Sequence, residues 1–545
     1  MTARHSTGRA HTTPTAHMPS SEGGRKARPP KTACGMFMRM FRSFEKQRPS
    51  WAVLLGVTVL TIVGAAMRLY GLSNQSFWFD EVCSWHTATQ PTLAGVWSGD
   101  LQWNMYPPLY GFVLRACIAV LGGAEWAMRL PSALAGIATI PLMYLVAARI
   151  FGDMEGLIAA GFTAFSMFTL YFAQEARPYA LLLLAVLIAV IAWTYMYEAW
   201  SQRRRAPRAA IAICWVASVC AAYLHYFGML FVALHCLATI TLLARNGFGL
   251  ARACAFYAGT AIAFAPWLPN MLWQLRRGTD GPQNPPPDAN VAVSFWHYVN
   301  SLFNHGQTAD VHASAVTWIA LVLVAFGIVC ETIRGGRRED DPNAGQRIRV
   351  VRAALLVAWL VLPFLIAYVK SSVSASVFTH RNLIVSLPAV YLLAAHGIAR
   401  LPLLPRKATT ALAAAALAAM AARTLTSGYY SFPHKDQFRE AVAAIAKQET
   451  RQPNAILVAY AELPFAFDYH LECAGSKLRP SLVAGRADHI DAMRALVRDR
   501  KPAAVWYLCT TPFPDSAFAA YLDTEFTIVD LQRFLRADAM LLVPK

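Results

Sequence analysis

The chain has 545 residues, of which 56% are hydrophobic and only 15% are charged. This composition excludes an ordinary soluble protein and predicts one that crosses a membrane many times and carries a soluble appendage. The formal net charge of +18 does not indicate a nucleic-acid partner, because most Arg and Lys lie in short connections between apolar runs, as in cytoplasmic loops.

The first 50 residues are polar, basic and rich in Pro, Ser, Thr and Gly, which predicts a disordered tail. They lack the short apolar stretch and the cleavage site of a secretory signal. The first apolar run, 51–72, is about as long as a bilayer is thick, so we expect an anchor that is retained.

Further apolar runs predict a membrane domain over residues 51–426. Several of them are shorter than the roughly 20 residues of a typical span, so their boundaries are soft. The eleven candidate spans are 51–72, 130–149, 156–173, 178–199, 209–224, 228–244, 253–269, 312–333, 353–371, 380–399 and 408–426.

The distribution of basic residues predicts the orientation of these spans. The tail before residue 51 is basic and should be cytoplasmic, which places Asp80 and Glu81 outside. The basic connection 201–208 should also be cytoplasmic, so the loop 174–179 lies on the same outer face as the acidic pair. This topology places residues 427–545 outside as well.

One apolar stretch, 106–122, does not fit the count as a crossing. Only an even number of crossings can separate the two outer loops, and this stretch is short, opens with two prolines and contains Arg115. We therefore predict an amphipathic helix along the outer interface, within an outer loop 73–129. The alternative is a true crossing, with one later run miscounted.

The C-terminal residues 427–545 predict a small soluble α/β domain. Helix and strand patterns alternate there, with helices at 438–448 and 489–501 and strands at 455–460 and 503–509. In an oxidising compartment Cys473 and Cys509 could form a disulfide, and the sequence leaves that pairing open.

The stretch SFWFDEVCSW, residues 76–85, contains the most informative polar residues. Asp80 and Glu81 are adjacent among aromatic side chains, and no Lys or Arg occurs between Leu72 and Pro108. Carboxylates held at a membrane surface can act as bases or bind a metal. The alternative is structural, because acidic residues also favour the first turn of a helix.

Eight further residues of the predicted outer loops complete the candidate site. Each alone has a structural explanation, such as an interfacial aromatic or a cation that reaches the headgroups. Together they offer cations that hold a lipid phosphate and a carboxylate that takes a proton from a hydroxyl. The eight are Tyr106, Glu175, Arg177, Tyr179, His225, Lys370, His380 and Arg381.

Several segments resemble the membrane glycosyltransferases of the C superfamily (GT-C). The likeness is to the family-39 and dolichyl-phosphate-mannose protein mannosyltransferase-like proteins of bacteria, which include the lipid A aminoarabinose transferases. It rests on RLYGLSNQSFWFDE (68–81), PPLYGFVLR (107–115), EWAMRLPSALAGI (125–137) and QEARPYALLLL (174–184), and in kind on HYF (225–227) and HRNLIVSLPAVYLL (380–393).

The resemblance implies an inverting transfer of a sugar from a polyprenyl phosphate to a hydroxyl of a lipid, glycan or protein acceptor. The reaction would take place on the outer, periplasmic face of the inner membrane. Asp80 would be the general base, and Glu81 would support it or help hold a divalent metal. Many relatives have His where this chain has Tyr106, which leaves the need for a metal open; no other cofactor is expected.

Two other classes compete with a glycosyltransferase. A transporter or flippase of lipid-linked sugars should carry ionisable residues near the middle of the membrane, in repeated halves. This chain shows no internal repeat and gathers its charges at one face. A sensor that works through its C-terminal domain is less favoured, because that domain shows no acid–base or metal constellation.

Overall fold

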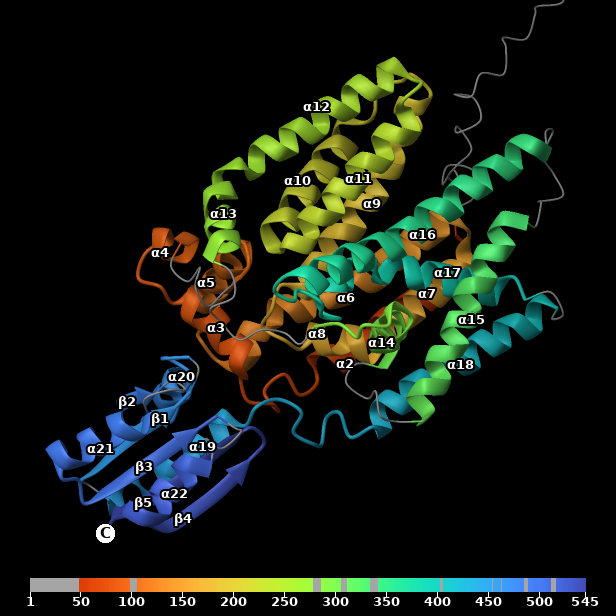
Figure 1. Cartoon of the computed structure of the whole chain (residues 1–545). Coiled ribbons are helices and arrows are strands. Elements are labelled where there is room, and N and C mark those ends of the chain that lie inside the picture. The colour runs from red at the N-terminus through yellow and green to blue at the C-terminus, as the bar shows by residue number, and fades with distance from the viewer. Residues whose placement is uncertain are drawn as a thin grey trace, which may run out of the picture.

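The computed structural model describes residues 49–98, 105–277, 286–304, 311–333, 342–401, 405–452, 454–461, 463–484, 489–510 and 516–545. Figure 1 shows a bundle of long helices with a small domain of helices and strands at one end. The prediction for the N-terminal tail concerns residues outside this range, apart from Pro49 and Ser50.

Nine helices of the described residues are long and apolar enough to cross a membrane. Each corresponds to one of the predicted spans. They are α2 (Trp51–Leu69), α6 (Glu125–Ile150), α9 (Tyr179–Ser201), α11 (Tyr226–Leu243), α12 (Gly247–Phe264) with its continuation through η3 (Ala265–Trp267) into α13 (Leu268–Arg277), α15 (Val311–Ile333), α16 (Pro342–Val373), η4 (Asn382–Ser386) with α17 (Leu387–Ala399), and α18 (Arg406–Thr426).

The other two predicted spans are less regular. Helices α7 (Asp153–Phe165) and α8 (Met167–Ala173) meet at an angle of 57° and count together as a tenth candidate span. The bend lies at Ser166, whose backbone is extended and whose side chain accepts a hydrogen bond from the backbone N–H of Phe168. The last, α10 (Arg208–Leu224), has 17 residues and is a shorter apolar helix.

The described residues of the predicted first outer loop include three short helices. They are α3 (Phe79–Ala88), α4 (Leu93–Ser98) and α5 (Leu109–Leu121), and they gather at the end of the bundle that faces the C-terminal domain (Figure 1). Helix α5 replaces the predicted 106–122 segment. Arg115 on it donates to the backbone oxygens of Ala88 and Pro91 at 3.2 and 3.3 Å, so the loop satisfies this charge. The interfacial placement of α5 stays a prediction.

One helix was not expected in the connection 270–311 between two of the predicted spans. Helix α14 (Val291–Asn304) packs against α15 and α8. Its C-terminal half is buried, which ties this loop to the bundle.

The C-terminal domain is a five-stranded mixed sheet with strand order β2-β1-β3-β5-β4. Strands β1, β2 and β3 are parallel, and β5 runs antiparallel to both β3 and β4. The elements are α19 (Phe438–Gln448), η5 (Glu449–Arg451), β1 (Ala455–Tyr460), α20 (Asp468–Cys473), β2 (Pro480–Ala484), α21 (His489–Arg500), β3 (Ala504–Cys509), α22 (Ser516–Glu525), β4 (Phe526–Phe534) and β5 (Ala537–Pro544). The predicted small α/β domain is therefore confirmed, within one residue at each of its four predicted elements.

The suggested disulfide is not formed. Both Cys473 and Cys509 are free thiols; Cys473 is exposed at the end of α20, whereas Cys509 is buried in the central strand β3. The sequence does not reveal that one of these cysteines lies at the surface and the other in the core.

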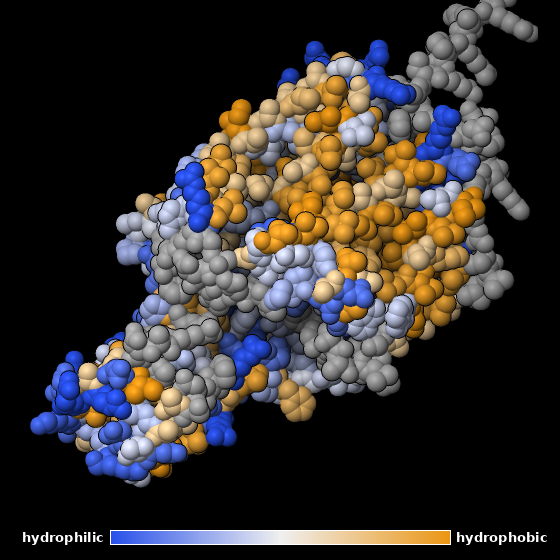
Figure 2. Space-filling model, in the orientation of Figure 1, coloured by the Kyte–Doolittle hydropathy of each residue, from blue (hydrophilic) through white to orange (hydrophobic). Residues whose placement is uncertain are grey.

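The two parts of the molecule differ in the hydropathy of their surfaces. Figure 2 shows hydrophobic side chains over most of the visible bundle and a largely hydrophilic C-terminal domain. Large apolar side chains on the bundle surface, such as Ile62, Leu237 and Ile262, are 60–73% exposed. This distribution fits helices that face lipid and a domain that faces water.

Candidate active site

The acidic pair lies in the first turn of α3, where a helix N-terminus favours negative charge. Because consecutive residues of a helix project about 100° apart, the two carboxylates point to different surroundings. The side chain of Asp80 remains 14% exposed, whereas that of Glu81 is fully buried.

Asp80 lies between two arginines that come from distant loops. Its Oδ2 pairs with Arg381 and lies 3.7 Å from Nη2 of Arg177. Arg177 also donates to the backbone oxygen of Asp80 at 2.9 Å and to Oγ of Ser84 at 3.0 Å. Burial alone would raise the pKa of Asp80, but the charges of Arg381 and then Arg177 outweigh it and hold the pKa below its usual value. The carboxylate is therefore ionised at neutral pH.

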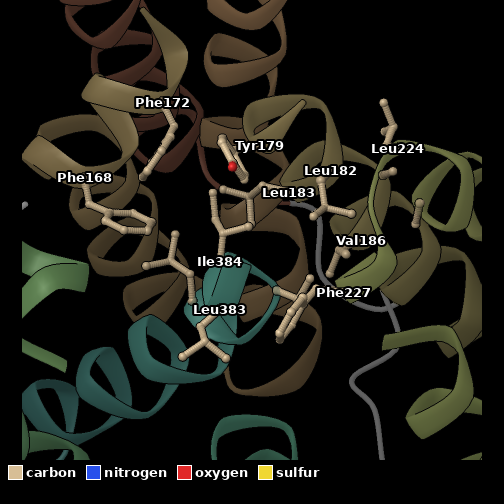
Figure 3. Close-up of a cluster of buried hydrophobic side chains, with 14 of the residues drawn as sticks. Phe168, Phe172, Tyr179, Leu182, Leu183, Val186, Leu224, Phe227, Leu383 and Ile384 are labelled. Carbon is tan, nitrogen blue, oxygen red and sulfur yellow. The ribbon is translucent and has the colours of Figure 1, made fainter. Parts of the chain in front are cut away.

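Arg381 is placed by the packing of the short helix η4. The residues that follow it, Leu383 and Ile384, are almost completely buried. Figure 3 shows Ile384 pointing between Phe168 of α8 and Leu183 of α9. This apolar contact anchors η4 in the bundle, so that the guanidinium of Arg381 reaches the acidic pair.

Glu81 is the centre of a buried ion network. It accepts hydrogen bonds from Arg129 at 2.8 and 2.7 Å and from the backbone N–H of Ala176 at 2.8 Å. The ammonium of Lys435 lies 3.2 Å from its Oε2. Burial would raise the pKa of Glu81, but Arg129 and Lys435 lower it to about 2.

These contacts of Glu81 affect whether it can bind the divalent metal that the resemblance allows. The oxygens of Glu81 are already engaged by Arg129, Ala176 and Lys435, so this carboxylate does not fit the role of a metal ligand. Among the residues that the structure describes, no group of three or more His, Cys, Asp or Glu is placed to hold a metal ion.

Glu175 is buried beside this network. Its Oε1 accepts a hydrogen bond from Nε1 of Trp78 at 2.9 Å, and its Oε2 has no hydrogen-bond partner among the described residues. Burial raises the pKa of Glu175 to about 7, and the charge of Lys435 is the strongest opposing influence. Glu175 can therefore change its charge near neutral pH.

Two tyrosines, Tyr106 and Tyr179, lie beside Arg177. The hydroxyls of Tyr106 and Tyr179 are 2.7 Å apart, and the guanidinium of Arg177 lies 4.6 Å from the centre of the Tyr106 ring. The prediction grouped these three residues, and the structure brings them together. The cation–π contact helps to hold Arg177 in place.

His225 packs against Tyr106 and is neutral. Its ring centre is 4.6 Å from that of Tyr106, and its Nδ1 accepts the backbone N–H of Phe227 at 3.0 Å, capping α11. Burial, and then the charges of Arg177 and Arg381, lower the pKa of His225 to about 3. His225 therefore does not supply positive charge to a phosphate.

The remaining two predicted residues are Lys370 and His380. The ammonium of Lys370 donates to the backbone oxygen of Ala375 at 2.5 Å, and no ion pair joins it to a site carboxylate within the described ranges. The ring of His380 lies 6.2 Å from that of Phe168, and burial lowers its pKa to about 4. Neither residue adds a cation to the centre of the site.

Arg129 and Lys435 belong to the site, and the sequence did not single them out. Arg129 was visible as a cation inside an apolar run, within one of the segments that carry the family resemblance. Lys435 follows the last membrane helix, and nothing in the sequence connects it with Glu81.

The chain resembles known proteins in part of its sequence and in its fold. Residues 105–273 match the family described as dolichyl-phosphate-mannose-protein mannosyltransferase. A search among curated protein sequences gives no match. Since the family match covers less than half of the chain, the fold provides the broader comparison.

Two solved structures are similar over most of the chain. One is ArnT from Cupriavidus metallidurans in the apo state, with a TM-score of 0.55, 14% identity, and coverage of 90% of this chain and 97% of that chain. The other is the archaeal oligosaccharyltransferase AglB from Archaeoglobus fulgidus, with a TM-score of 0.50, 11% identity, and coverage of 86% and 70%. The family match and the shared fold confirm the predicted resemblance to the GT-C superfamily and agree with the prediction of a glycosyltransferase.

Proposed function

We propose that this chain, which has the GT-C fold, transfers a sugar from a polyprenyl phosphate to a hydroxyl acceptor, with inversion at the anomeric carbon. The observation that carries the proposal is the placement of Asp80 between Arg381 and Arg177 at one end of the bundle. The AglB structure contains a dolichol-phosphate, and the matched family is named for a dolichyl-phosphate sugar, which supports this class of donor.

In this reaction Asp80 accepts the proton of the acceptor hydroxyl. The hydroxyl oxygen forms a bond to the anomeric carbon while the bond from that carbon to the phosphate oxygen breaks. The polyprenyl phosphate leaves with the bonding electron pair. Arg381 and Arg177 stabilise its growing negative charge, which is where fixed cations lower the barrier most. A single displacement of this kind inverts the configuration.

The two arginines also couple donor binding to the strength of the base. In the free site they lower the pKa of Asp80, which makes it a weak base. A donor phosphate competes for Arg381, and the pKa of Asp80 then rises towards its ordinary value. Asp80 therefore becomes a better proton acceptor when the donor is in place.

We place the site at the periplasmic surface of the inner membrane. The support is the positive-inside pattern: the basic connections of the sequence fall at the opposite end of the spans from α3. On this arrangement the N-terminus is cytoplasmic and the C-terminal domain is periplasmic.

The test is a transfer assay with purified protein in lipid nanodiscs and a panel of polyprenyl-phosphate sugars. We expect one donor to be consumed, and Asp80→Asn to lower the rate by about 10²–10⁴-fold, the usual contribution of a general base. The matched control is Asp499→Asn, because the side chain of Asp499 is 69% exposed in the C-terminal domain.

Full transfer by Asp80→Asn would remove Asp80 from the role of base. Movement of the donor across the bilayer without its consumption would instead favour a flippase.

A further inference from the structure

The segment that follows the last membrane helix inserts a lysine into the site. The side chain of Lys435 is only 2% exposed. Its ammonium lies 3.2 Å from Oε2 of Glu81, donates to the backbone oxygen of Gln174 at 3.1 Å, and lies 5.5 Å from the centre of the Tyr171 ring. A lysine so deeply buried is costly unless it is paired, and here its partners are groups of the site.

Lys435 reaches Asp80 through the loop 174–177. It holds this loop at Gln174, and Glu81 holds the same loop at the N–H of Ala176. The next residue is Arg177, whose guanidinium contacts both the backbone and the carboxylate of Asp80. The position of Lys435 is thus transmitted to the base through one short stretch of backbone.

Residues close to Lys435 in the sequence contact the segment just before the acidic pair. The carboxylate of Asp436 accepts the N–H of Phe79 at 3.3 Å, and the N–H of Arg439 donates to Oγ of Ser76 at 3.0 Å. Arg439 also pairs with Glu125 at 2.5 Å. The start of the C-terminal domain therefore contacts the segment that leads into α3.

We propose that Lys435 is a positioning residue of the site, which fixes Arg177 against Asp80 through the loop 174–177, so that the C-terminal domain completes the active site. This inference rests on the proposed sugar transfer. Lys435 does not touch the reacting atoms in this scheme; it acts through Glu81, Glu175 and the loop 174–177.

The charge of Glu175 gives the proposal a measurable pH dependence. Burial raises the pKa of Glu175 to about 7, and Lys435 opposes this rise, so removal of Lys435 should raise the pKa further. The other charged or titratable groups that face Glu175 are Glu81, Arg177, Asp80, Arg381, Tyr110, Tyr171 and Tyr429. Of these groups Glu81 also contacts Lys435 directly, at 3.2 Å, so the substitution removes a positive charge from both carboxylates.

The experiment compares the pH profile of transfer for the full chain and five variants. We expect a midpoint near pH 7 in the wild type. In Lys435→Met it should move up by about 1–3 pH units, the usual effect of losing one nearby opposite charge. Lys435→Arg should stay closer to the wild type, because it keeps the charge. Lys447→Met is the matched control, because Lys447 is exposed on α19. Glu175→Gln should lack this midpoint, and adding Lys435→Met to Glu175→Gln should not restore it.

A second readout does not depend on activity. Hydrogen exchange of the amides of residues 174–177 should be faster in Lys435→Met than in Lys447→Met, because the loop has lost the hydrogen bond from Lys435 to the backbone oxygen of Gln174.

The outcomes separate this inference from the proposed function. If the wild type transfers sugar but its profile is flat around pH 7, or if Lys435→Met keeps the wild-type midpoint, the inference is wrong. If hydrogen exchange of the loop is unchanged, the positioning role is wrong. If no donor is consumed by the wild type while exchange increases in Lys435→Met, the proposed transfer fails and the structural coupling stands.

Discussion

At the scale of single residues, adjacent acids have different tasks. Asp80 faces the open site and two arginines that a donor phosphate can attract, whereas Glu81 points into the protein and is fixed by Arg129 and Lys435. The sequence predicted the pair and most of the residues around Asp80. It could not separate the two roles, because the division depends on which way each side chain points from α3.

Glu81→Gln should destabilise the folded protein. The substitution leaves the charge of Arg129 buried without its carboxylate, and breaking a buried pair in this way costs about 3–5 kcal/mol. Thermal unfolding in detergent should show a clearly lower midpoint than for the control Asp499→Asn. An unchanged midpoint would mean that the Glu81 network does not support the fold.

The stability provided by Glu81 should depend on pH in a defined window. Its pKa is about 2 in the folded protein, against an ordinary value of 4.5. A lowered pKa stabilises the folded state fully above the unfolded value, and the stabilisation is lost as the pH falls from about 4.5 towards 2. Unfolding midpoints measured across this window should fall more steeply for the wild type than for Glu81→Gln. Parallel curves would contradict the assignment.

At the scale of elements, the apolar runs predicted where helices occur but not how closely they approach. Helices α15 and α17 touch backbone to backbone at a pair of glycines. A Cβ added to Gly327 would lie 2.2 Å from the backbone oxygen of Leu393, and one added to Gly397 would lie 2.2 Å from that of Leu323. Small residues permit this approach between membrane helices, and α17 continues directly from η4, which follows Arg381.

Gly397→Val should separate α15 from α17. The added side chain has no space, so we expect a lower thermal midpoint and, through displacement of η4, weaker sugar transfer. Gly259→Ala is the control, because a Cβ there would make only an ordinary contact at 3.6 Å with Trp215. Equal midpoints for the two variants would show that the close approach is not required.

There are physical reasons why some elements were not predicted from the sequence. The break between α7 and α8 lies at Ser166, a small residue inside a long apolar run, so hydropathy did not reveal it. Strand β4 is at the edge of the sheet and mixes exposed apolar residues with Asp530 and Arg533, which hides its period. It joins β5 through a tight turn at Arg536, with φ of 55°. The strands β1 and β3 were predicted because burial makes them apolar throughout or nearly so.

At the scale of the whole molecule, the orientation in the membrane is a prediction from the charge pattern. The eleven predicted spans correspond to nine long helices, one bent pair and one shorter helix among the described residues. The site at α3 and the C-terminal domain lie at the same end of the bundle (Figure 1). The sequence could predict this common side from charge, but not that the domain contributes Lys435 to the site, because that contact is made only in the folded molecule.

A reporter at the C-terminus should be exported. Alkaline phosphatase fused after Lys545 should be active in a bacterial host, because this enzyme needs the oxidising periplasm to form its disulfides. The same reporter inserted within the basic connection 201–208 should be inactive. A fusion after Lys545 that is inactive although the protein is abundant would reverse the orientation and with it the proposed side of the reaction.

The contact between Asp436 and Phe79 joins residues that are 357 positions apart. During synthesis the first outer loop emerges long before the segment that holds it from behind. The hydrophobic spans can enter the bilayer one after another, but the acidic pair gains its final partners only when the last part of the chain has been made. A truncated chain that ends before Lys435 would therefore contain the long helices and still lack contacts that hold the acidic pair.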